Sequence, residues 1–226
     1  MPVSVATVHA RDTVRLVSSR HRVDPIPHIA EEAVGDDAEL LDAWISLTDA
    51  TSDRMAMEQR WLLEGPPTST AIGIPHGAAL RAAFAYPSGA DRGGARFNTA
   101  APGGGAWYAS SEIAGAIAEV QHHHGRFLIE SGITDEVMHY DPYLADMAGT
   151  MVVIQAPEPS LLDPDDYRQS QAFAERIRHD GHRAIVYPSV RGPFTNIACL
   201  EPTIVQHIRR GEPMELHWVG ATWADQ

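Results

Sequence analysis

The chain has a single cysteine and no long hydrophobic run. Its 226 residues include only Cys199, so no disulfide can form within the chain, which fits a reducing compartment. The longest apolar runs, such as "MVVI" at 151–154, are far shorter than a membrane span. The N-terminal residues "MPVSVATVHARDTVRLV" lack a basic segment followed by an apolar one. We therefore expect no signal peptide, no membrane association and a cytoplasmic location.

Basic residues are scarce relative to acidic ones. The chain has 17 Lys and Arg against 30 Asp and Glu, a formal net charge of −13. Nucleic acid binding normally needs a basic patch, so we expect no direct nucleic-acid partner. A phosphorylated small ligand would also be repelled at long range and would need a few locally placed arginines. The position of each arginine is therefore informative.

The remaining composition is that of a globular protein, with 44% hydrophobic and 21% charged residues. Residues 1–75 are predicted as an N-terminal segment that begins with a strand and continues as a helical extension over 36–65, packed on the core. The stretch "GPPTST" at 65–70 breaks the helical pattern. Residues 76–226 are predicted as the core, and the whole as a single domain.

Residues 92–120 are predicted to run strand, turn, strand, helix. "TAAPGGG" disfavours a helix, because proline and three glycines interrupt it. Ser110 or Ser111 is expected to cap the following helix. The apolar stripe of this helix is expected at Ile113, Ile117 and Val120, with Glu119 about 120° away from it.

The C-terminal half has the pattern of an α+β protein. Strands are predicted in "GTMVVIQA", "HRAIVYPSV", "NIACLEP" and "PMELHWVG". A helix is predicted in "DPDDYRQSQAFAERIRHDG", with a stripe from Tyr167 to Ile177 and with Gly181 at its end. Strands outnumber long helices, which favours a mixed sheet over a doubly wound parallel one.

Several familiar sites do not match the sequence. "GGGAWYAS" lacks the Lys of a P-loop, and no G-x-G-x-x-G precedes a helix. Three consecutive histidines in "QHHHGRF" at 121–127 cannot all face one point on a helix, so we expect no metal site. Cys199 is expected in the core. Ser189 lies outside any G-x-S-x-G pattern, and spacing alone makes Arg96, Tyr108 and Glu119 ordinary residues.

A resemblance gives these residues a role. "GGARFN", "AWYAS" and "IAEV", followed by "GHRAIVYPSVR" and "NIACLEP", resemble the RES domain family. The Arg, Glu and Ser for which that family is named match Arg96, Glu119 and Ser189, and a family Tyr matches Tyr108. Phe97 stands where the family often has Trp, which keeps an aromatic ring. The resemblance extends from residue 14 to about 218, and only loosely over 21–75.

The resemblance implies a fold and an activity. RES proteins resemble ADP-ribosyltransferases, with a split mixed β-sheet core, flanking helices and an NAD cleft. They act as toxins paired with Xre/ParS-like antitoxin proteins. NAD+ is their substrate, so no separate cofactor is expected.

Cleavage of the nicotinamide–ribose bond produces an oxocarbenium-like ribose, which explains the residue types. Glu119 would stabilise that cation. Tyr108 would stack on nicotinamide. Arg96 would hold the pyrophosphate. The further assignments are Ser189, which would contact a ribose or orient Glu119, and Arg15, Arg20 and Asn98 as additional substrate-binding residues.

Three functions remain open from the sequence. The first is NAD+ degradation with water or phosphate as acceptor, as in a glycohydrolase or phosphorylase. The second is an ADP-ribosyltransferase whose acceptor is an essential protein. The third, a non-catalytic interaction module, is disfavoured because the Arg, Glu and Ser are all retained. Many transferases of this fold carry a second Glu where this chain has Ile117, and we favour NAD+ degradation. The acceptor, the antitoxin, the oligomeric state and the role of residues 28–75 are left undetermined.

Overall fold

A computed structural model describes residues 3–19, 76–85, 94–99, 104–155 and 158–224. Contacts divide the chain into two compact units, one of residues 1–22 with 70–226 and the other of residues 23–69, and every described residue belongs to the first. The helices predicted between 36 and 65 lie outside the described residues. The division at residue 75 stays a prediction.

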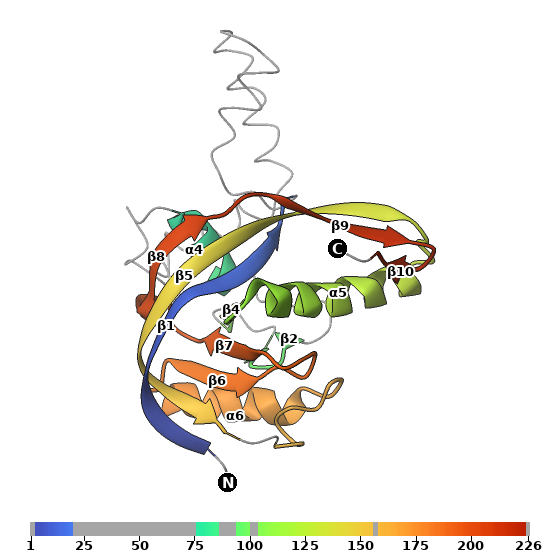
Figure 1. The fold of residues 1–226 in the computed structure, drawn as a ribbon. Helices are drawn as coiled ribbons and strands as arrows, with labels where there is room; N and C mark the ends of the chain where they lie inside the picture. Colours follow the sequence, from blue (N-terminus) through green and yellow to red (C-terminus); the bar gives the residue numbers. More distant parts are fainter. Residues whose placement is uncertain (1–2, 20–75, 86–93, 100–103, 156–157, 225–226) are drawn as a thin grey trace, which may run out of the picture. The chain divides into compact units, whose positions relative to one another are not determined.

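Two long strands organise the sheet. β1 (Val3–Ser18) pairs antiparallel with β5 (Glu136–Ile154) along almost its whole length (Figure 1). The register shifts once, between Ala10 and Thr13, and Asp12 at this irregularity has a positive φ of 53°. The strand expected near residue 150 is therefore the last third of a much longer one.

The shorter strands close this pair into a ring. The sheet order is β1-β4-β7-β6-β5, and β1 also pairs with β5. β5 and β6 are parallel, whereas the other pairs are antiparallel, so the expected α+β fold with a mixed sheet is confirmed. β8 and β9 each pair with β5, and β10 pairs with β9. The bounds are β2 (Gly94–Ala95), β3 (Asn98–Thr99), β4 (Trp107–Ser110), β6 (Ala184–Pro188), β7 (Thr195–Cys199), β8 (Val205–Arg210), β9 (Met214–Val219) and β10 (Thr222–Trp223).

Three α-helices and one 3-10 turn are described: α4 (Gly77–Ala85), α5 (Ile113–Glu130), α6 (Arg168–His179) and η4 (Pro202–Ile204). α6 packs on β5, β6 and β7 through Phe173, Ala174 and Ile177. These residues and Ser170 are buried at helical spacing, as predicted. Gly181 follows the helix with φ +81°, a conformation that favours glycine.

α5 differs from its prediction at both its start and its packing face. Its N-cap is Glu112, with no side-chain cap bond, because Ser110 is still paired with Asn196 in β4 and β7. Ile113 is 47% exposed, whereas Gly115 is buried against the sheet. A Cβ at Gly115 would lie 2.2 Å from the Ser110 hydroxyl, so glycine lets the helix approach the strand. Ile117 and Val120 pack at the margin of a cluster of Leu128, Met138, Tyr140, Leu216 and Trp218.

No helix among the described residues has the length and apolar character needed to cross a bilayer. Cys199 is buried in β7, as expected. Burial raises the pKa of its thiol to about 12, so the thiol stays protonated at neutral pH. This environment makes Cys199 a packing residue.

Candidate functional site

A cavity of about 360 Å³ lies between β1, β4, α5 and the loop that precedes α6. This volume falls in the usual range of small-molecule pockets. The predicted site residues in its wall are Arg15, Arg96, Tyr108 and Glu119. Ser189 and Asn98 are hydrogen-bonded to two of these wall residues, and Arg20 lies outside the described residues.

The carboxylate of Glu119 is held from one side. Its Oε1 accepts a hydrogen bond from Ser189 Oγ at 2.9 Å and one from Asn196 Nδ2 at 2.8 Å. No described residue donates to Oε2. Glu119 therefore has one oxygen fixed by the protein and one available to a ligand at the pocket wall.

The turn between β6 and β7 positions Ser189. Its backbone N–H donates to Phe194 O at 2.8 Å, and its Oγ accepts the N–H of Arg191 at 3.0 Å. The hydroxyl proton is then directed to Glu119. Ser189 thus contacts Glu119 and is absent from the cavity lining, and its role in orienting that carboxylate stays a prediction.

Arg96 lies in the turn of the β2–β3 hairpin and is 7% exposed. Its Nη1 donates to Leu161 O at 3.2 Å and to Asp163 O at 2.7 Å. Its guanidinium also lies over the ring of Tyr167, 4.9 Å from the centroid. One amino group of Arg96 is thus committed to the protein, and the remaining nitrogens are the ones that can meet a ligand.

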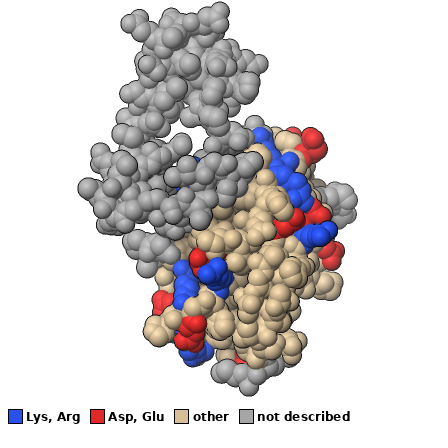
Figure 2. Space-filling model, turned by 90° about the vertical axis from the view of Figure 1, so that its left-hand side faces the viewer, with Lys and Arg blue, Asp and Glu red and all other residues tan. Residues whose placement is uncertain are grey.

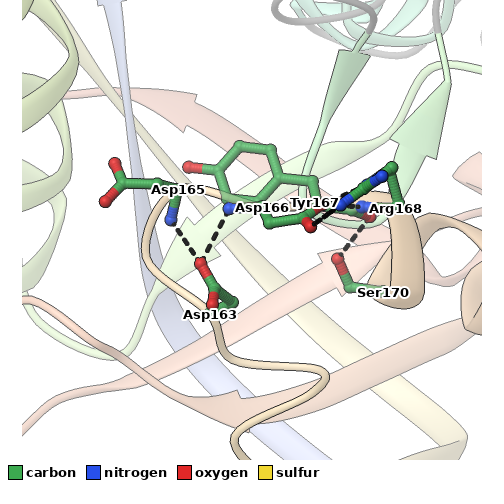
Figure 3. A network of polar contacts seen from close by, with 6 residues as sticks. All are labelled: Asp163, Asp165, Asp166, Tyr167, Arg168 and Ser170. Carbon is green, nitrogen blue, oxygen red and sulfur yellow. Dashed lines mark hydrogen bonds and ion pairs between the residues drawn. The ribbon is translucent and has the colours of Figure 1, made fainter.

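An acidic loop before α6 carries Asp163 and Tyr167, two of the residues that contact Arg96 (Figure 3). Asp163 Oδ1 accepts the backbone N–H groups of Asp165 at 2.9 Å and Asp166 at 2.7 Å, and these bonds lower the pKa of the Asp163 carboxyl. Arg168 donates to Asp166 and lowers the pKa of that carboxyl to about 2. Both carboxylates are therefore ionised at neutral pH, and the loop keeps its hydrogen bonds there.

Tyr108 faces the cavity from β4, and its hydroxyl has two fixed partners. It donates to Asn98 Oδ1 at 2.9 Å and accepts the N–H of Phe97 at 2.9 Å. Burial raises the pKa of this hydroxyl above its ordinary value, so it remains a donor at neutral pH. Asn98 therefore fixes Tyr108 and is absent from the cavity lining.

Helix α6 anchors the hairpin that carries Arg96. Gln171 Nε2 donates to Ala95 O at 3.1 Å and to Asn98 O at 3.3 Å, one carbonyl on each side of the turn. Further along the helix, Arg178 Nη2 donates to Gly105 O at 2.8 Å in the segment that leads into β4. The two elements that present Arg96 and Tyr108 are thus both tied to α6.

Replacing Gln171 tests this anchoring. Gln171→Met keeps the length of the side chain and removes both donors, so the Phe97 amide should exchange with solvent about fivefold faster, since one such hydrogen bond contributes about 1 kcal/mol. Hydrogen exchange of the ligand-free protein measures this rate. Gln155→Met is the matched control, because Gln155 donates to Ser4 at the far end of the β1–β5 pair. Equal exchange rates in the two variants would contradict the anchoring role.

Arg15 enters the cavity from β1. Its Nη1 makes one long hydrogen bond, 3.5 Å to Tyr108 O, and its buried Nε has no hydrogen-bond partner among the described residues. Its guanidinium lies 5.2 Å from the ring centroid of Trp107. Burial lowers its pKa to about 10, which leaves it charged at neutral pH. Arg15 is a half-buried cation whose Nε is an unused donor.

The surface charges contrast with those of the pocket. On the face in Figure 2, basic and acidic residues lie next to each other in small groups separated by uncharged surface. Ion pairs such as Arg126–Asp165 at 3.1 Å and Arg183–Glu201 at 3.1 Å are partly exposed and contribute little to stability. Neither Arg15 nor Arg96 forms an ion pair with a described residue. The pocket thus concentrates unpaired positive charge.

Sequence reasoning missed several wall residues. α5 presents one stripe to the cavity, and it ends in two histidines: Ala116, Glu119, Val120, His123 and His124. His124 Nδ1 contacts the hydroxyl of Tyr140, which also lines the cavity. The remaining missed wall residues include Asn196, Tyr167 and Tyr187. Of these wall residues, only those in α5 could have been found from the sequence, because positions 116, 119, 120, 123 and 124 lie on one face of a helix.

The three consecutive histidines of α5 do not all face the cavity. His123 and His124 line the cavity, whereas His122 is absent from its wall. Burial lowers the pKa of His122 to about 4, and the nearby Arg191 adds to the effect, so His122 is neutral at neutral pH. Within the described residues, no group of three His, Cys, Asp or Glu side chains is arranged to hold a metal ion.

The fold and the pocket define an α+β protein with a mixed sheet, whose cavity wall combines a fixed carboxylate with arginines and tyrosines. The model of the RES domain matches residues 70–219, and the chain belongs to the RES domain family. This confirms the resemblance drawn from the sequence.

Two further comparisons concern individual proteins. No curated protein matches the chain. Among solved structures, the crystal structure of the M. tuberculosis MbcT–MbcA toxin–antitoxin complex is similar with a TM-score of 0.40 and 16% identity. The match covers 57% of this chain and 74% of that one.

Proposed function

We propose that this protein is the toxin of a toxin–antitoxin pair and cleaves the nicotinamide–ribose bond of NAD+, which depletes NAD+ and arrests growth. The observation that carries the proposal is the placement of Glu119, fixed by Ser189 and Asn196, in the wall of a cavity that also holds Arg15 and Arg96. A carboxylate next to unpaired cations suits a substrate that combines a diphosphate with a cationic ribosyl centre.

The reaction needs little proton transfer at the leaving group. The C1′–N bond breaks with its electron pair on nicotinamide, which leaves as a neutral base, and the ribose becomes an oxocarbenium-like cation. Oε2 of Glu119 would stabilise this cation or hydrogen-bond a ribose hydroxyl. The acceptor oxygen then bonds C1′ and releases its proton to solvent. Water as acceptor gives ADP-ribose, and phosphate gives ADP-ribose 1″-phosphate.

The arginines and Tyr108 would bind and orient the dinucleotide. Arg15 has a free Nε, and Arg96 keeps nitrogens beyond Nη1, so both can donate to phosphate oxygens. Tyr108 would place its ring against nicotinamide, because its hydroxyl is already held by Asn98 and Phe97. Arg20 stays a further candidate contact.

A toxin of this kind requires a partner that silences it. We extend the proposal to an Xre/ParS-like antitoxin whose carboxylate would enter the pocket near Arg15 and Arg96. In a chain of net charge −13, these unpaired cations are a place that attracts an anion. The proposed location is the cytoplasm, where NAD+ is abundant.

The products of the purified protein distinguish the alternatives. Incubation with NAD+, with and without phosphate, followed by mass spectrometry, should give nicotinamide together with ADP-ribose or ADP-ribose 1″-phosphate. ADP-ribose attached to a protein from an added extract would instead establish the transferase. Unchanged NAD+ under all conditions would contradict both.

A further inference from the structure

The ring of Tyr167 is a part of the pocket wall to which the proposed reaction gives no role. Tyr167 precedes α6 as its N-cap residue, is half-buried and lines the cavity. Its hydroxyl makes no hydrogen bond with the described residues, unlike that of Tyr108. Figure 3 shows the ring extending from the start of α6 along the loop of Asp163, Asp165 and Asp166. The ring is thus presented to the cavity.

Hydrogen bonds fix the backbone on both sides of Tyr167 before any ligand binds. The Asp163 carboxylate accepts two backbone N–H groups just ahead of Tyr167. The carbonyl of Tyr167 accepts Ser170 Oγ at 2.9 Å and the N–H of Gln171 at 2.8 Å. Because both sides of the residue are fixed, a ligand that stacks on the ring would lose little affinity to ordering it.

Arg96 and its neighbour Phe97 link this ring to Tyr187. The Arg96 guanidinium contacts the Tyr167 ring directly. Burial raises the pKa of Tyr187 well above its ordinary value; the Glu119 carboxylate adds to the rise, and Arg96 opposes it. Phe97 packs edge-on against Tyr187 with 4.8 Å between ring centroids. Tyr187 pairs across β6 and β7 with Asn196, which donates to Glu119. The contacts therefore run from Tyr167 to Arg96, then through Phe97 and Tyr187 to Glu119.

This order matches the order of groups in a dinucleotide. If the ribose next to nicotinamide lies at Glu119 and the diphosphate lies at Arg96, the other nucleoside lies on the side of Tyr167. We infer that the adenine ring of the substrate stacks on the Arg96–Tyr167 pair. Purine rings stack on both tyrosine rings and guanidinium planes. This inference rests on the proposed NAD+ reaction.

Kinetics with two substrates tests the inference. Loss of a base stack on an aromatic side chain weakens binding about tenfold or more. Tyr167→Ala should therefore raise the KM for NAD+ by about this factor with little change in kcat. The KM for nicotinamide mononucleotide, which has no adenine, should not change. Tyr167→Phe should match the wild type, because it keeps the ring and removes a hydroxyl without a described partner.

A binding measurement separates this inference from the proposed reaction. ADP carries adenine and a diphosphate but no nicotinamide. The wild-type protein should bind ADP in a calorimetric titration, and Tyr167→Ala should bind it about tenfold more weakly. ADP binding that depends on Tyr167, in a protein that leaves NAD+ intact, would support the adenine site and contradict the reaction.

Two results would overturn the adenine site. One is an equal rise of the KM for NAD+ and for nicotinamide mononucleotide in Tyr167→Ala, which would place the ring away from adenine. The other is ADP affinity unchanged in Tyr167→Ala. Tyr167→Leu, which keeps more apolar volume in the wall, provides a second variant if the alanine variant is poorly folded, and the same two results apply to it.

Discussion

Glu119→Gln should leave the protein folded and able to bind NAD+ while lowering the rate of NAD+ cleavage by about a hundredfold or more. The glutamine oxygen can still accept from Ser189 Oγ and Asn196 Nδ2, so the side chain keeps its place. The negative charge is lost, and a neutral amide stabilises a developing cation far less. Loss of one transition-state contact of this kind typically costs 10²–10³ in kcat.

Two measurements check this expectation. Single-turnover cleavage of NAD+ gives the chemical rate, and calorimetric titration gives the affinity, which should stay near that of the wild type. Expression of the wild-type protein alone in bacteria should stop growth, and Glu119→Gln should permit it. Glu112→Gln is the control, because it makes the same change at the start of the same helix, outside the cavity lining. A Glu119→Gln protein as toxic as the wild type would exclude Glu119 as the catalytic carboxylate.

The elements that sequence analysis predicted well are those with a strong local period. α6 shows why: Phe173, Ala174 and Ile177 repeat at helical spacing, and Gly181 follows the last turn. α5 lacks such a period, because one face packs through Gly115 and Gly125 and another carries polar residues into the cavity. Small residues on a packing face carry no hydrophobic signal, so the cap and the place of Ile113 in the stripe were predicted wrongly, whereas Ile117 and Val120 do pack.

The contacts that complete the site join residues far apart in the chain. Arg96 donates to Leu161 and Asp163, and Glu119 accepts from Ser189 and Asn196. The closed ring of strands depends on the same kind of long-range pairing, since β1 meets β5 more than a hundred positions later in the chain. Spacing within one segment cannot indicate such pairs. The RES resemblance supplied four of the cavity residues, but it did not supply the hydrogen bonds that orient them.

Loss of the guanidinium group should lower the thermal stability of the protein at Arg96 but not at Arg15. Arg15 is half-buried and forms no ion pair with a described residue, and it has a free Nε and one hydrogen bond of 3.5 Å. Arg96 has two hydrogen bonds to carbonyls and a contact with the Tyr167 ring. Arg15 therefore resembles a residue prepared for a ligand, and Arg96 is also part of the fold. The same substitution to methionine at each position tests this difference.

Arg15→Met should weaken NAD+ binding by about tenfold to a hundredfold, since a charge-assisted hydrogen bond contributes about 1.5–3 kcal/mol. It should not lower the thermal midpoint of the ligand-free protein. Burial lowers the folded-state pKa of Arg15 from its ordinary value to about 10, so the unfolded chain holds this proton more tightly. The charged group thus destabilises the fold at neutral pH, and this cost is relieved only as the pH rises through about 10.

Arg96→Met should lower the thermal midpoint, because the carbonyls of Leu161 and Asp163 lose their donor and the loop before α6 loses an anchor. Thermal unfolding and NAD+ titration of both variants give the two quantities side by side. The expected pattern is a large loss of affinity with a maintained or raised midpoint for Arg15→Met, and a lowered midpoint with weaker binding for Arg96→Met. An Arg15→Met protein that binds NAD+ as tightly as the wild type would exclude Arg15 as a phosphate contact.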